Sequence, residues 1–433
     1  MKGLKHMLIA LAALCPLGML GAQDNALTLS SALEKAMANN YGIILSRSNA
    51  DVAGINNDWG NAGRYPTVSF SASDNNSYNL TGQSYTGRLT GGLALNWTLF
   101  DGFYVQLTKS RLETLEDLSK GQLAVMVENT VEDVILAYYN VLLQEERLEV
   151  LHTVMVLSED RYSYEQRKKD LGGSVTYDVL QAQNVYLSDK AAWMNQEVVL
   201  RNAVRNLNFL LGDTPESQWT FLEEFEADAQ PYVLSDLLDR MKASNLTLKN
   251  QYSNLMLAEN QTERSRSAYY PSLSLGTGID ATQTWTGGGT GGNASLVPYG
   301  NLRLSFDIYS AGARKRSVEI ARIQEENAQV EIREMEHALT NELFNLHDYY
   351  GVRQALVDLA RENLAAAELN MSISEEKYKS GVINSFNYRD VQLLYLNASL
   401  GRLQAIYNLV TTKTALTRLT GGFLQEGAEV AAD

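Results

Sequence analysis

The segment LALNWTLF at residues 93–100 recurs as LRLSFDIY at residues 302–309, and PTVSFSA at residues 66–72 recurs as PSLSLGT at residues 271–277. Apolar and polar side chains alternate along all four segments, a pattern that predicts β-strands with one apolar and one polar face. The two offsets, 209 and 205 residues, are nearly equal. Self-similarity at such a constant spacing predicts a duplicated structural unit.

The duplication continues beyond the strands. At the 209-residue offset, identical residues coincide in pairs: Gly172 with Gly381, Gln183 with Gln392, Tyr186 with Tyr395, Leu207 with Leu416, and Gly212 with Gly421. We therefore predict a first structural repeat at residues 23–211, an acidic, solvated connector at 212–232, a second repeat at 233–422 and a C-terminal tail at 423–433.

Long helices are expected after each strand pair, because residues 67–214 and the chain beyond residue 298 contain no proline. Apolar side chains recur every three or four residues over about 103–170 and 313–379, as in a coiled coil. At ~1.5 Å per residue, each of these helices would be roughly 100 Å long.

Each long helix is expected to form a hairpin with a returning helix. Gly172 and Gly381 suit the left-handed conformation that follows a helix end. The returning helices are predicted from near Tyr177 to Gly212 and from near Phe386 to Gly421.

A single helix is expected to open each repeat. The first would run from Ser31 to about Asn57, with Ser31 and Glu34 as a capping box, and the second from about Leu234 to Arg266.

The N-terminus has the layout of a secretory signal peptide at residues 1–22. Lys2 and Lys5 precede an apolar run at residues 7–20, and cleavage is expected near Ala22. The single cysteine, Cys15, lies inside this segment and not at its cleavage point, so we expect a cysteine-free mature chain without lipidation. No later run reaches the ~18 apolar residues of a membrane-spanning helix. A net charge of −15 argues against nucleic acid as a partner.

The strands are long enough to cross a bilayer if tilted, since about nine or ten residues suffice. A soluble antiparallel sheet would alternate in the same way, so the strands alone leave both readings open. Polar, glycine-rich loops are expected at residues 74–92 and 283–300. Aromatic residues gather near the strand ends, as they do in membrane barrels. They are Tyr78, Tyr85, Trp97, Phe100, Phe103, Tyr104, Trp285, Tyr299 and Tyr309. Four strands cannot close a barrel, so a membrane role requires several chains to share one.

The segment LTLSSALEKAMANN at residues 27–40 resembles the opening motif of the TolC-type outer-membrane efflux proteins. YKSG at residues 378–381 with NYRDVQ at 387–392 is similar to that family's hairpin-tip motif, and DVLQAQ at 178–183 is the first-repeat version. The resemblance covers nearly the whole mature chain.

This resemblance implies an α+β membrane protein that assembles as a homotrimer. Twelve strands, four per chain, would form one transmembrane β-barrel in outer-membrane lipid, continuous with a long antiparallel coiled-coil barrel of helices in the periplasm. The chain would be the exit duct of a tripartite efflux or type I secretion system, passing small molecules or polypeptides. Its partners would be a periplasmic adaptor protein and an inner-membrane transporter of the RND, ABC or MFS type.

The hairpin tips hold the candidate functional residues. In a trimer, Asp178 and Asp390 would each form a ring of three carboxylates favouring cations, or they lie near the starts of the returning helices only because acids are favoured there. The family commonly carries an acid at the position of Asn387, so strong cation selectivity is not expected. The predicted tip and gate residues are Gly172, Asp178, Gln181, Tyr378, Gly381, Asn387, Arg389 and Asp390.

Hydrogen bonds and ion pairs between the hairpins could hold the tip shut, and Tyr378, Arg389 and Asp178 are available for them. The first repeat carries Lys169 and Gln181 where the second carries Tyr378 and Asp390, so we expect any gate to lie in this asymmetry.

No catalytic motif is found, and no cofactor is expected. The histidines, His6, His152, His337 and His347, lack metal-ligand spacing. The alternative function is an exported structural or adhesive coiled-coil protein whose strands form a small soluble sheet.

Overall fold

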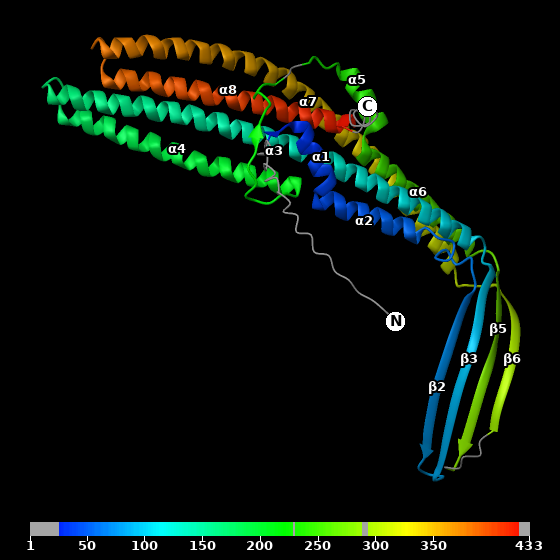
Figure 1. Ribbon diagram of the computed structural model, residues 1–433. Helices are drawn as coiled ribbons and strands as arrows, with labels where there is room; N and C mark the ends of the chain where they lie inside the picture. Colours follow the sequence, from blue (N-terminus) through cyan, green and yellow to red (C-terminus); the bar gives the residue numbers. More distant parts are fainter. Residues whose placement is uncertain (1–25, 228–229, 288–292, 424–433) are drawn as a thin grey trace, which may run out of the picture.

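The computed structural model describes residues 26–227, 230–287 and 293–423 of the chain. The predicted signal peptide, the glycine run at residues 288–292 and most of the predicted tail lie outside these ranges. Figure 1 shows an elongated molecule in which a sheaf of helices is followed at one end by a four-stranded sheet. Within the described residues, no helix combines the length and the apolar character needed to cross a bilayer.

Two hairpins of long helices make up most of the helical body. Helices α3 and α7 have 67 residues each, and each returns through a shorter partner; the bounds are α3 Tyr104–Asp170, α4 Thr176–Leu211, α7 Ala313–Lys379 and α8 Ser385–Leu419. These bounds confirm the helices predicted from the absence of proline. α3 packs against both α4 and α8, and α7 packs against α8, so α4 and α7 lie on the outside of the four-helix layer.

The prediction of one opening helix per repeat is wrong, because the structure has two in each. Their bounds are α1 Leu29–Asn39, α2 Tyr41–Asn56, α5 Leu234–Ser244 and α6 Leu246–Ser267. The predicted capping box of Ser31 and Glu34 is also wrong. Thr28 is the N-cap of α1, and its side chain and that of Ser31 cap each other's backbone N–H groups.

An asparagine stands at each break between opening helices. Asn40 and Asn245 cap the helices that follow them, and their amide groups donate to the carbonyl oxygens of Leu210 (2.9 Å) and Leu419 (3.0 Å). Each break is thereby joined to the end of a returning helix.

The sheet contains strands β2 Thr67–Asn79, β3 Ser84–Phe100, β5 Ser272–Thr286 and β6 Asn293–Ser305. They pair antiparallel in the order β2-β3-β5-β6. The strands are longer than predicted, because most residues of the expected loops at 74–92 and 283–300 continue the ladders. β6 instead stops at Ser305, earlier than predicted, and residues 306–312 link it to α7.

The register of the ladders separates an apolar from a polar face. Phe70 pairs with Leu93, Leu93 with Ile279, and Ile279 with Pro298, which makes one apolar row across all four strands. The row three rungs nearer the helices lies on the other face, and its residues Thr67, Asn96, Gly276 and Asn301 are all polar or glycine. The sheet is therefore apolar on one side and polar on the other.

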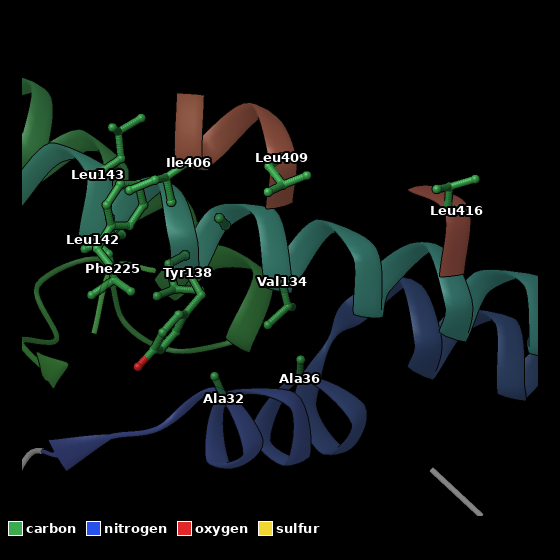
Figure 2. Packing of buried hydrophobic residues seen from close by; sticks show 14 of the residues in the cluster. Ala32, Ala36, Val134, Tyr138, Leu142, Leu143, Phe225, Ile406, Leu409 and Leu416 are labelled. Atoms are coloured by element: carbon green, nitrogen blue, oxygen red, sulfur yellow. The ribbon is translucent and has the colours of Figure 1, made fainter. Parts of the chain in front are cut away.

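The main core lies midway along the helical body, where α1 and the connector pack on α3 (Figure 2). Tyr138 is fully buried there, and its hydroxyl bonds to the Leu27 carbonyl and to the Glu223 carboxylate.

The connector is not the solvated linker predicted from its acidity. Phe225 is buried in the core, Trp219 donates to Asn208 at 2.7 Å, and the short strands β1 Ala26–Leu27 and β4 Thr220–Phe221 pair in parallel. The connector is therefore packed against the helical body, because its apolar side chains cover α1.

Candidate functional site

Each hairpin tip is a tight turn formed around a glycine. Gly172 and Gly381 have φ of +80° and +78°, and a Cβ at either position would meet no atom within 4 Å. Their N–H groups donate to Lys169 (2.8 Å) and Tyr378 (3.0 Å) carbonyls. The left-handed backbone, and not lack of space, therefore selects glycine here.

Tyr378, on the last turn of α7, joins the second hairpin to the first. Its side chain is 5% exposed, and its hydroxyl donates to Glu165 Oε1 on α3 at 2.7 Å. The ring stacks on Tyr388 with centroids 4.7 Å apart and contacts Tyr164. Burial, followed by the hydrogen bond to Glu165, raises the pKa of Tyr378, and burial raises the pKa of Tyr388 to about 12. Both tyrosines are therefore neutral near neutral pH, and Tyr378 keeps its donor proton.

Arg389, on α8, makes a second link between the hairpins. Its guanidinium donates to both carboxylate oxygens of Asp189 on α4, at 2.8 and 2.9 Å. The two side chains are only 17% and 11% exposed. A bidentate pair at this burial is stronger and more selective in geometry than a surface ion pair.

Arg161 lies between these two links on α3. It is 3% exposed and donates to the Ser385 carbonyl at 3.3 Å, and burial lowers the pKa of its guanidinium. With the buried Glu165 and Asp189 and the half-buried Arg389, it forms a group of two positive and two negative side chains. We call these four residues together with Tyr378 the tip cluster.

The predicted site residues divide into two groups. Tyr378 and Arg389 lie in the tip cluster, in contacts between the two hairpins. Asp178 instead stays within its own hairpin, in the first turn of α4, with Ser174 Oγ 3.5 Å from its carboxylate. Gln181, Asn387 and Asp390 are exposed on the returning helices.

Sequence reasoning missed the partners in the tip cluster. Arg161, Glu165 and Asp189 were not singled out, although a signal existed. Val154, Ser158, Arg161 and Glu165 are all buried at spacings of four, three and four, so the buried stripe of α3 continues with polar and charged residues. Charges on a stripe that should be apolar indicate partners on the facing helix.

Comparisons with known proteins agree with this architecture. The model of the family described as "Outer membrane efflux protein" matches residues 32–213 and 237–422. The Cation efflux system protein CusC of Escherichia coli O157:H7 is 22% identical over 371 residues, covering 83% of this chain and 78% of that protein.

Solved structures share the fold at low sequence identity. The crystal structure of the CmeC outer membrane channel of Campylobacter jejuni superposes with a TM-score of 0.74 at 17% identity, over 91% of this chain and 85% of that one. A crystal structure of CusC gives a TM-score of 0.73 at 18% identity, over 92% and 93% of the two chains.

Proposed function

This chain belongs to the outer membrane efflux protein family, and we propose that three copies form one exit duct through the outer membrane. The family places the chain in the outer membrane and makes it a channel protein, not an enzyme. In this proposal a periplasmic adaptor joins the duct to an inner-membrane transporter of the RND, ABC or MFS type. Small molecules or polypeptides then pass through it without further energy input, in a tripartite efflux or type I secretion system.

The sheet is the observation that carries the proposal. Its apolar face suits lipid, and its polar face suits a water-filled lumen. Among the described residues, the outer strands β2 and β6 each have one edge without a paired strand. Open edges are not tolerated in the hydrocarbon layer, and four strands are too few to close a barrel. Three copies would supply twelve strands and pair every edge.

The helices support the same assembly. The outer helices carry exposed apolar residues that a lone chain would leave in water, namely Met194 and Val198 on α4 and Val352, Leu356 and Leu359 on α7. An apolar helix face of this kind is normally covered by another helix. If α7 of one copy packs on α4 of the next, three copies close a ring of twelve long helices.

We also propose that the tip cluster holds the periplasmic end of the duct closed. Its contacts connect the two hairpins of a chain, and opening the tip requires the hairpins to separate. Tyr378 and Arg389 belong to the second repeat, where the sequence asymmetry predicts the gate. The division into repeats at residues 23–211 and 233–422 remains our proposal; in the structure two helices, two strands and two helices occur in the same order on both sides of the connector.

Substitutions at Asp178 and Asp390 test whether these residues form the proposed carboxylate rings. If the rings line the constriction, Asp390→Ala and Asp178→Ala each change the conductance or the cation preference of single channels in planar bilayers. Asn387→Ala, which removes an exposed neutral side chain at the same tip, serves as the control. Wild-type conductance and selectivity in both aspartate variants would leave these residues as helix-start acids only.

Purification from membranes tests the function itself. We expect detergent to be needed for extraction, a heat-sensitive trimer on a denaturing gel, and discrete conductance steps in a planar bilayer. A soluble monomer or dimer after signal removal would instead favour the structural or adhesive coiled-coil protein.

A further inference from the structure

A basic and apolar patch lies where the second strand pair meets the helices. It comprises Phe306, Ile308, Tyr309, Arg314, Lys315 and Arg316, and we call it the rim patch. It follows the end of β6 and includes the first turn of α7, at the end of the sheet that adjoins the helical body (Figure 1). Ile308 and Tyr309 are 90% and 86% exposed in the chain.

The positive charges of the rim patch are not explained by helix stability. Three consecutive cations, Arg314, Lys315 and Arg316, lie at the start of α7, and the first turn of this helix contains no acidic residue. Cations are disfavoured at this end of a helix, because the helix dipole is positive there. The first repeat has Val105, Gln106 and Leu107 at the matching positions, so the duplicated fold forms without them.

The fold uses these cations without neutralising them. Arg314 donates to Ser310 Oγ (3.2 Å) and to the main-chain oxygens of Ala268 (3.3 Å) and Asp307, and it lies over the rings of Tyr269 and Phe306. Arg316 donates to the Ala311 carbonyl at 3.1 Å. All these acceptors are neutral oxygens, so the guanidinium charges stay available to an anion. With the Asp307 carboxylate counted, the patch keeps a formal charge of about +2 in a chain of net charge −15.

We propose that the rim patch binds the headgroup of an anionic phospholipid in the periplasm-facing leaflet of the outer membrane. The inference rests on the proposed barrel, because the barrel places residues 306–316 at the lipid–water boundary. There the apolar part of Tyr309 and the Ile308 side chain contact acyl chains, and the cations contact phosphate. Each lysine or arginine near a bilayer surface strengthens binding of anionic lipid about fivefold.

Native mass spectrometry of the full-length protein in detergent tests the inference. The probes are dioleoyl phosphatidylglycerol and dioleoyl phosphatidylcholine, which share tails and phosphate but differ in net charge. We expect the wild type to retain phosphatidylglycerol preferentially. Lys315→Gln/Arg316→Gln removes two cations and is expected to reduce this preference about 25-fold. Arg314 is left in place because its hydrogen bonds hold the turn.

A matched pair of exposed cations provides the control. Arg240→Gln/Lys242→Gln on α5 removes the same charge from the helical body and leaves the preference unchanged. An equal loss in this control, an unchanged preference in the rim variant, or release of the lipid by millimolar inorganic phosphate would each overturn the inference. Loss of the trimer in the rim variant without a change in lipid preference would assign the patch to a contact between copies, which also overturns it.

Conductance separates this inference from the proposed function. The rim variant is expected to conduct like the wild type, because the replaced side chains of Lys315 and Arg316 are exposed and lie at the start of α7, outside the strands. A lost lipid preference with intact conductance supports the inference. A wild-type protein that never conducts would contradict the proposed duct.

Discussion

At the scale of single residues, the tip cluster shows how two hairpins of one chain are held side by side. Glu165 accepts from Tyr378 through Oε1 and from Ser174 through Oε2, so both oxygens of a carboxylate that is 2% exposed have donors. A buried carboxylate that loses a donor costs more than the hydrogen bond itself.

Removing the Tyr378 hydroxyl should therefore loosen the closed tip. Tyr378→Phe leaves Glu165 Oε1 without its donor and destabilises the closed arrangement by about 1.5–3 kcal/mol. We expect a higher mean single-channel conductance than in the wild type. Tyr186→Phe is the matched control, because the Tyr186 hydroxyl accepts from Lys190 on its own helix and not from the other hairpin in the described residues. Equal conductance in both variants would contradict a closing role for Tyr378.

A second buried acid lies in the middle of the helical body. Glu128 on α3 is 5% exposed, and burial raises its pKa to about 7. The nearby Glu132 also raises this pKa, whereas the positive charges of Arg418 on α8 and Lys249 on α6 lower it. Because the folded pKa exceeds the unfolded one, the folded state binds more protons. The destabilising effect of Glu128 is therefore absent below pH ~4.5 and complete above pH ~7.

Glu128→Gln should stabilise the protein in a pH-dependent way. Thermal unfolding in detergent is expected to show the variant more stable than the wild type by about 1–2 kcal/mol at pH 8, and no difference near pH 4.5. Glu132 and Asp133 also have raised pKa values owing to burial. They are present in both proteins, so the comparison isolates Glu128. A constant difference at all pH values would contradict the titration.

At the scale of elements, the sequence predicts the long helices well and the helix breaks poorly. Absent proline and a regular apolar spacing are properties of the helix itself, so they can be read locally. The breaks at Asn40 and Asn245 depend on contacts with residues some 170 positions away. Gly212 and Gly421 allow this approach, since a Cβ there would lie 2.6 Å from the Asn39 carbonyl and 2.7 Å from the Ser244 carbonyl.

The lengths of the strands were underestimated for a similar reason. Residues 74–79 are polar on both faces and so lack alternation, yet each pairs with a residue of β3 in the ladder.

In the tip, Tyr378 and Arg389 could be named from motif resemblance. Their partners Glu165 and Asp189 could not, because only the packing of one hairpin on the other brings them together.

The helix break can be tested at Asn245, which is buried. Asn245→Ala removes both the N-cap of α6 and the donor to Leu419, and should lower the free energy of unfolding by about 2–3 kcal/mol. Asn245→Asp keeps the cap acceptor but loses the donor, so it separates the two contributions when melting temperatures are compared. A wild-type melting temperature for Asn245→Ala would show that the break does not depend on this side chain.

At the scale of the whole molecule, one chain leaves exposed surfaces that the proposed trimer would cover. In the part of the chain that the structure describes, the sheet ends in two unpaired strand edges, and the outer helices α4 and α7 expose apolar side chains. Both features are expected if identical copies meet in a ring, because each copy would then cover the exposed edge and helix face of its neighbour.

Single-channel recording on the purified protein, with the mass of the same sample measured by native mass spectrometry, tests the central claim most directly. The proposed duct predicts three chains per particle and discrete conductance steps that grow when Tyr378 is replaced by phenylalanine. A particle of one or two chains that stays soluble without detergent and never conducts would contradict it.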